Sequence, residues 1–207
     1  MNSFKVLVVS VGLLCTALIA SGCGSTGSGS CSASSCSGCC QGDVCQNGTT
    51  ASACGKSGVS CTACTSAQTC SSSQACAFDG AAMWKVQPLS ATIKNNNNGA
   101  SWDPDDSAPD AYVELYCPMN ATQRTTATPT VNDSYTPTWS ADGCVVSASA
   151  LTANGFAYQV LDGDTLSNDS ITQKISVVVT EADLAAGRAT VAVTDGLLTL
   201  NIGLQKQ

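Results

Sequence analysis

The chain has 207 residues, with 15 acidic side chains, 8 basic side chains and no histidine. The net charge of −7, without a cluster of Lys or Arg, argues against a nucleic-acid partner, because binding phosphates needs such a cluster. Histidine is the usual general base, so its absence excludes Ser-His and Cys-His catalysis as well as His-based metal sites. We therefore expect a protein that is not an enzyme.

The first residues are typical of an export signal. Lys5 supplies a positive charge, and the apolar run over 6–20 is shorter than the roughly 18 residues that span a bilayer stably. Ala20-Ser21-Gly22-Cys23 resembles the lipobox of bacterial lipoproteins, in which the cysteine is lipid-modified and becomes the new amino terminus. The resemblance implies a signal peptide over 1–22, a membrane anchor at Cys23 with a flexible tether over 23–30, and a place in the bacterial cell envelope, at the outer membrane or cell surface. Ordinary signal cleavage at the same bond is the alternative.

Residues 31–78 are rich in cysteine and poor in large apolar side chains. Ten cysteines fall between Cys31 and Cys76, among Ser, Gly and Thr. An even number of cysteines in an exported chain predicts disulfides, so we expect an irregular segment held by about five of them, with a pairing that the sequence does not give. Zinc is the alternative, because two pairs have ligand-like spacing: Cys36-x2-Cys39 and Cys61-x2-Cys64.

From residue 80 to residue 207 the pattern changes to that of a β domain. Phe156, Tyr158 and Val160 alternate with smaller or polar neighbours, which indicates a strand with one buried face. A short helix is expected over 180–187, with Thr180 and Asp183 as a weak capping pair. The expected strands are 84–93, 111–117, 124–128, 144–148, 156–161, 171–179, 189–194 and 197–204. Short strands in this number predict a mainly β fold, an eight-stranded antiparallel β-sandwich, in which Cys117 and Cys144 are candidates for one more disulfide.

Acidic residues gather in two of the expected connections between strands. Asp103, Asp105, Asp106 and Asp110 lie in one, and Asp162, Asp164 and Asp169 lie in the other. Two unit charges 4 Å apart repel by about 1 kcal/mol in water and by about 4 kcal/mol at an effective dielectric near 20. If the sandwich brings both connections to one edge, a cation would offset this repulsion, and carboxylate oxygens without thiolate or imidazole favour Ca²⁺. The alternative is a set of solvated loop acids.

Three pieces of this region together resemble a C2 domain, the calcium-dependent lipid-binding β-sandwich. Residues 102–115, WDPDDSAPDAYVEL, resemble the first calcium loop and the strand after it. Thr136-Pro-Thr-Trp139 resembles the Asn-Pro-x-Trp turn of the family, and residues 160–164, VLDGD, with Asp169 resemble the third calcium loop. The order and spacing of the three pieces agree with the family, which implies the C2 fold and calcium binding for residues 80–207.

The resemblance also implies a role for each acid. Asp110 and Asp162 would bridge two calcium ions, Asp103 or Asp105 together with Asp164 would complete the cage, and Asp169 would cap the outer ion. In C2 domains, side chains beside the cage can enter a bilayer, which implies membrane contact by Trp102 and Leu166. For Trp102 the alternative is packing against its own loop. Only Arg124 falls near the basic strand patch of the family, which favours a purely calcium-bridged lipid or a protein partner.

The sequence thus predicts an exported, lipid-anchored protein that displays a calcium-binding C2-like module and contacts lipid or a surface partner through its acidic loops. A structural lipoprotein in which calcium only stabilises the loops is the second hypothesis. Hydrolysis of a glycoside by paired carboxylates is a third, for which the sequence offers no supporting pocket.

Overall fold

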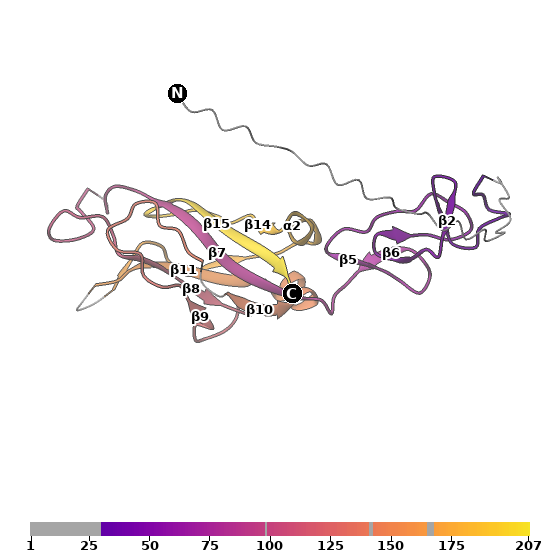
Figure 1. The fold of residues 1–207 in the computed structure, drawn as a ribbon. Coiled ribbons are helices and arrows are strands. Elements are labelled where there is room, and N and C mark those ends of the chain that lie inside the picture. The colour runs from indigo at the N-terminus through magenta and orange to yellow at the C-terminus, as the bar shows by residue number, and fades with distance from the viewer. Residues whose placement is uncertain (1–29, 98, 141–142, 165–167) are drawn as a thin grey trace, which may run out of the picture.

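The computed structural model describes residues 30–97, 99–140, 143–164 and 168–207. Two parts follow each other along the chain, a cysteine-rich segment and a β-sandwich (Figure 1). The expected signal peptide, Cys23 and Leu166 lie outside the described residues. Within these ranges, no helix has the length and apolar character needed to cross a membrane.

The cysteine-rich segment consists of three short hairpins held by disulfides. Strand β1 (Cys39–Gln41) pairs with β2 (Val44–Gln46), β3 (Thr49–Thr50) with β4 (Ala53–Cys54), and β5 (Gln68–Cys70) with β6 (Cys76–Phe78). The five bonds are Cys31–Cys40, Cys36–Cys45, Cys39–Cys61, Cys54–Cys70 and Cys64–Cys76. The expected disulfides are confirmed, and the zinc alternative is wrong, because oxidised sulfurs offer no thiolate to a metal.

The sandwich has two antiparallel sheets. One has the order β10 (Cys144–Ser147), β7 (Met83–Ile93), β15 (Leu197–Lys206) and β14 (Arg188–Ala189). The other has the order β12 (Asp169–Ser170), β11 (Phe156–Asp162), β8 (Ala111–Tyr116) and β9 (Thr126–Ala127), and β13 (Ile175–Val177) also pairs with β11. The predicted β-sandwich is confirmed. The bond between Cys117 and Cys144 is confirmed too, and it joins the two sheets, since Cys117 follows β8 and Cys144 begins β10.

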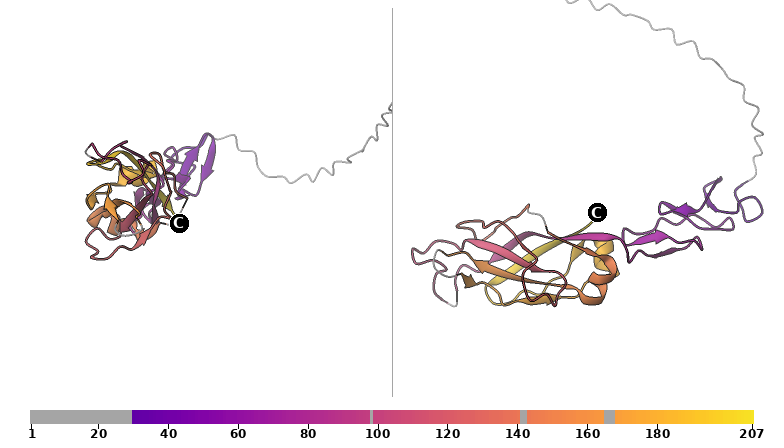
Figure 2. Two further views of the ribbon diagram at one scale, coloured as in Figure 1. Left: turned by 90° about the vertical axis from the view of Figure 1, so that its left-hand side faces the viewer. Right: turned by 90° about the horizontal axis from the view of Figure 1, so that it is seen from below.

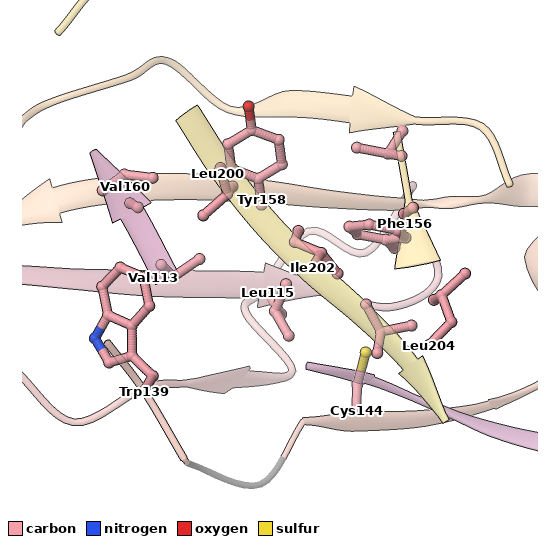
Figure 3. Close-up of a cluster of buried hydrophobic side chains, with 14 of the residues drawn as sticks. Val113, Leu115, Trp139, Cys144, Phe156, Tyr158, Val160, Leu200, Ile202 and Leu204 are labelled. Atoms are coloured by element: carbon pink, nitrogen blue, oxygen red, sulfur yellow. The ribbon is translucent and has the colours of Figure 1, made fainter. Parts of the chain in front are cut away.

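The core lies between the sheets and is closed by side chains of β7, β8, β11 and β15. Figure 3 shows Val113 and Leu115 of β8 facing Ile202 and Leu204 of β15, all of them buried. In β11 the side chains on both faces are buried, whereas the alternation of the sequence predicts one buried face. Ala157 points away from Phe156 and Tyr158 and is still fully buried, between Tyr116 and Ser176 of the neighbouring strands.

Local irregularities shorten several of the expected strands. The expected strand over 171–179 is ordered as β13 only, because the N–H groups of Ile171 and Thr172 both donate to the carbonyl of Val160, so that two residues oppose one. The strands expected over 124–128 and 189–194 are likewise reduced to two residues each, β9 and β14.

The expected helix is present as α2 (Glu181–Ala186), and an unexpected helix, α1 (Ala148–Asn154), follows β10. The cap of α2 is the predicted one, since Thr180 and Asp183 form a full capping box and Gly187 ends the helix at φ 70°. The cap of α1 is Ser147, whose side chain accepts a hydrogen bond from the backbone N–H of Ala150. Both helices lie at the end of the sandwich that adjoins the cysteine-rich segment (Figure 1).

Candidate metal centre

Both acidic connections reach the end of the sandwich that lies away from the helices. The first follows the end of β7 and leads into β8, and the second follows the end of β11. Because β8 and β11 are antiparallel neighbours that pair Ala111 with Asp162, the start of one strand lies beside the end of the other. The backbone N–H of Asp110 donates to Oδ1 of Asp162 at 2.6 Å. The structure therefore brings the two connections together, as the sequence predicts.

Asp162 is the buried centre of this group. The residue has 0% of its surface exposed, and its Oδ2 has no hydrogen-bond partner. Burial is the largest cause that raises the pKa of Asp162 to about 6, and the negative charges of Asp103, Asp164 and Asp110 raise it further. The hydrogen bond from the Asp110 N–H acts in the opposite direction and lowers the pKa. A buried, unpaired carboxylate oxygen is costly, and a cation at this point would remove the cost.

Asp103 and Asp110 lie beside Asp162. Carboxylate oxygens of Asp103, Asp110 and Asp133 all lie within 4.8 Å of one another. Ser107 fixes Asp103, since its hydroxyl donates to Oδ2 of Asp103 at 3.0 Å. Three carboxylates at this spacing repel one another unless water screens their charges or a cation lies between them.

The remaining expected ligands, Asp164 and Asp169, come from the connection after β11. Asp164 is half-buried, and its pKa is raised by burial first and then by the charges of Asp103 and Asp169. Asp169 is exposed and lies opposite Asp162 in the register of β11 and β12. Both residues thus lie at the same edge as Asp103 and Asp110.

Asp133 joins the group although it lies outside the two acidic connections that the sequence singles out. It is in a turn, with φ 52°, and its backbone N–H donates to Oδ1 of Asp110 at 2.9 Å. The pairing of Val131 with Ala111 brings this third connection to the edge. Asp133 is the only acid near Val131 in the sequence, so no local pattern of the sequence singles it out.

Two of the acids of the first connection lie apart from the group. Asp105 is exposed, and hydrogen bonds from the side chain and backbone of Ser107 lower its pKa. Asp106 has φ 66° and accepts a hydrogen bond from the hydroxyl of Ser101 at 2.7 Å. Of the two candidates for one ligand position, Asp103 and not Asp105 lies with the other carboxylates.

Trp102 lies next to the cluster but faces inward. It is 5% exposed, and its Nε1 donates to the carbonyl of Lys94 at 2.8 Å. Its ring lies so close to Gly196 that a Cβ there would be 2.6 Å from Cη2. This burial favours packing against its own domain over membrane contact.

The cations nearest to the expected basic patch are already engaged. Arg124 pairs with Glu114 at 2.7 Å, and the Lys174 ammonium lies 3.7 Å from the ring centre of Tyr116. The described part of this sheet face therefore offers little free positive charge to an anionic surface.

The fold and the edge define a class of protein, the C2-type β-sandwich with acidic loops. The family model of the C2 domain matches residues 87–192, which is 106 of the 207 residues, and the chain belongs to this family. Solved structures similar to the chain include one titled "Structure of a C2 domain", with 14% identity, a TM-score of 0.39, and coverage of 60% of this chain and 97% of that one. Another is BON1-C2B, with 11% identity, a TM-score of 0.38, and coverage of 62% and 94%. A third is a C2 domain of RIM from Drosophila, with 16% identity, a TM-score of 0.33, and coverage of 60% and 96%. No curated protein matches the chain.

The donor atoms of the cluster fit the ion that C2 domains commonly bind. All of them are carboxylate oxygens, which suit a hard cation that tolerates irregular ligation. Asp103, Asp110, Asp133, Asp162, Asp164 and Asp169 could contribute to such a site.

Proposed function

We propose that this protein binds Ca²⁺ at the acidic edge of its C2 domain and, in the calcium-loaded state, contacts an anionic group on a lipid or on a surface partner. The buried Oδ2 of Asp162 is the observation that carries the proposal. An acidic cluster alone can be solvated, but an ionised oxygen that is withdrawn from water needs a positive partner.

The burial of each aspartate indicates which side of the calcium site it would form. Asp162 and Asp110, joined by a hydrogen bond, would hold the inner side of the site, with Asp103 and Asp164 beside them. Asp133 and Asp169, which are exposed, would contribute from the outer side. Bound calcium offsets much of the local negative charge and can itself coordinate phosphate or carboxylate oxygens, so an edge that repels these groups without the ion would bind them with it.

The setting of this contact is part of the proposal. Export through residues 1–22 and anchoring through Cys23 would place the domain at the bacterial cell envelope, as a binding protein and not an enzyme. The lipobox-like sequence and the disulfides of the cysteine-rich segment support export, since disulfides persist in oxidising compartments.

A vesicle assay tests the contact. The purified protein should sediment with phosphatidylserine-containing vesicles in the presence of calcium and stay in solution with chelator. Asp162→Asn should abolish sedimentation, whereas Asp105→Asn should not, because Asp105 lies outside the cluster. Binding that is independent of calcium would refute the proposed contact.

A second function is favoured by the burial of Trp102 and the pairing of Arg124 with Glu114. Both observations remove side chains that would otherwise engage a bilayer. In this alternative, calcium only ties the loops together and nothing binds at the edge. It predicts calcium-dependent stabilisation of the protein together with no calcium-dependent sedimentation.

A further inference from the structure

The cysteine-rich segment is fixed to the sandwich by contacts that cross the boundary between them. Ala67 is 1% exposed and belongs to the same hydrophobic core as Trp84. The hydroxyl of the neighbouring Ser66 donates to the carbonyls of Leu184 and Ala185 in the last turn of α2, at 3.2 and 3.3 Å. The segment therefore occupies a site on the sandwich and does not only precede it.

Lys206, at the end of β15, adds a second attachment. Its Nζ donates to the carbonyl of Ser66 and to Oδ2 of Asp79, each at 3.2 Å. Asp79 in turn donates its backbone N–H to the carbonyl of Ala67 at 3.0 Å. Lys206 of the sandwich is thus hydrogen-bonded to the cysteine-rich segment and to the link that follows it.

The link between β6 and β7, residues 79–82, has its backbone engaged. The N–H of Ala148 donates to the carbonyl of Ala82, and the N–H of Ser149 donates to the carbonyl of Gly80, at 2.8 and 2.9 Å. Backbone that is hydrogen-bonded to α1 cannot turn freely, so the link is no flexible hinge. Five disulfides stiffen one part and a closed core stiffens the other, so we expect the two parts to keep one relative arrangement.

The acidic edge lies at the opposite end of this body. Strand β7 begins at the link and ends where the first acidic connection starts, and its 11 residues span about 36 Å. Figures 1 and 2 show the cysteine-rich segment at one end of an elongated molecule and the connections after β7 and β11 at the other.

The charge of the described residues is distributed in the same direction. The cysteine-rich segment, residues 31–78, carries one acid, Asp43, and one base, Lys56. Eight aspartates lie in the three connections at the far end: Asp103, Asp105, Asp106, Asp110, Asp133, Asp162, Asp164 and Asp169. Calcium therefore changes the electrostatics of the far end and leaves the near end unchanged.

We propose that the cysteine-rich segment and the sandwich form a rigid arm that presents the calcium edge to a second, opposing membrane with anionic phospholipids, and not to the membrane that carries the anchor. The inference rests on the proposed function. The tether over 23–30 spans at most about 29 Å when fully extended, which is less than the length of β7 alone, so it cannot raise the near end of the arm far enough for the acidic edge to point straight at the membrane that carries the anchor. If the long axis of the molecule lies parallel to the membrane that carries the anchor, the faces of the sheets point toward that membrane and the acidic edge points along it.

The test uses the chain from Cys23 to Gln207. The cysteines from Cys31 onward are all paired, so the thiol of Cys23 is free for coupling to a maleimide lipid in phosphatidylcholine vesicles. These donor vesicles are mixed with acceptor vesicles of phosphatidylcholine and phosphatidylserine, and vesicle clustering is measured by light scattering. We expect calcium to raise scattering several-fold and chelator to reverse the rise. Asp162→Asn should remove the response and Asp105→Asn should retain it.

A hinge variant tests the rigidity. A flexible Gly-Ser insertion between Asp79 and Gly80 separates the two parts without touching the acidic edge. With phosphatidylserine present in the donor membrane as well, the parent should still cluster vesicles, whereas the variant should bind its own membrane and cluster several-fold less.

Three outcomes would contradict the inference, and each refutes a different part of it. Calcium-dependent sedimentation of the free protein without clustering by the attached protein would refute the opposing-membrane geometry and leave the proposed function intact. No effect of calcium on either sedimentation or stability would refute the proposed function itself. Equal clustering by the hinge variant would refute the rigid arm.

Discussion

The substitution Asp162→Asn tests two effects of the buried carboxylate: the stability that it costs without calcium, and the calcium binding that it allows. At pH 7 without calcium, most Asp162 side chains are ionised, because the pKa of this buried group is about 6. The difference from an ordinary aspartate, with a pKa near 3.9, corresponds to a destabilisation of about 3 kcal/mol. Asparagine keeps an oxygen that can accept the Asp110 N–H and removes the charge.

We therefore expect Asp162→Asn to be more stable than the parent when calcium is absent. The gain is about 1–3 kcal/mol, since the buried amide of asparagine adds a donor that must find a partner among the neighbouring carboxylates. With 2 mM calcium and a Kd of about 0.1–1 mM, the parent should gain roughly 0.7–1.8 kcal/mol, and the variant should gain nothing.

Denaturant unfolding followed by tryptophan fluorescence measures both quantities. The three tryptophans, Trp84, Trp102 and Trp139, are all buried in the sandwich, so the signal reports this part of the chain. Asp105→Asn is the matched control and should stay within about 0.5 kcal/mol of the parent while keeping its calcium response. A variant Asp162→Asn that is less stable than the parent in chelator, and still gains stability from calcium, would refute the reasoning.

Three further predictions concern pH, packing and the disulfides. Because the folded-state pKa of Asp162 is raised to about 6, the stabilisation from protonated Asp162 is complete below pH 4 and is lost as the pH rises through 6. Denaturant titrations should therefore show that the calcium-free protein is more stable at pH 5 than at pH 7. The opposite pH dependence, or the same pH dependence in Asp162→Asn, would contradict this prediction. Gly196→Ala places a Cβ 2.6 Å from the Trp102 ring, so we expect a loss of about 1–3 kcal/mol with a changed fluorescence spectrum, and an unchanged spectrum and stability would show that the contact is not tight. Reduction should unfold residues 31–78 before the sandwich, since that segment has no large apolar core, and amide hydrogen exchange after mild reduction should show early loss of protection there; equal protection of both parts would oppose it.

Elements of the sandwich that depend on a local sequence pattern are predicted correctly. The capping box of α2 depends on Thr180 and Asp183 alone, and both side chains are where the pattern indicates. The bulge at Ile171 and Thr172 depends on a tertiary contact with Val160, which no local pattern contains, so the strand there is shorter than predicted. Helix α1 is not among the predicted elements, although Ser147 and Gly155 flank it in the positions of caps.

The candidate site is predictable in part for a similar reason. The alternation of β11 and the acids around it place Asp162 and Asp164 at a strand end, and the pairing of β8 with β11 brings Asp110 there. Asp133 stands alone in its connection, and only the tertiary bridge between Val131 and Ala111 carries it to the edge. The choice between Asp103 and Asp105 depends on the turn around Ser107, which the spacing of the acids does not fix.

A crystal structure of the protein with calcium tests most directly whether the edge is a metal site. An anomalous difference map should show a peak between carboxylate oxygens of Asp103, Asp110 and Asp162, at the typical calcium–oxygen distances of about 2.3–2.6 Å, with Oδ2 of Asp162 as one of the ligands. A map without a peak at millimolar calcium, in which Oδ2 of Asp162 stays without a partner, would contradict the proposal.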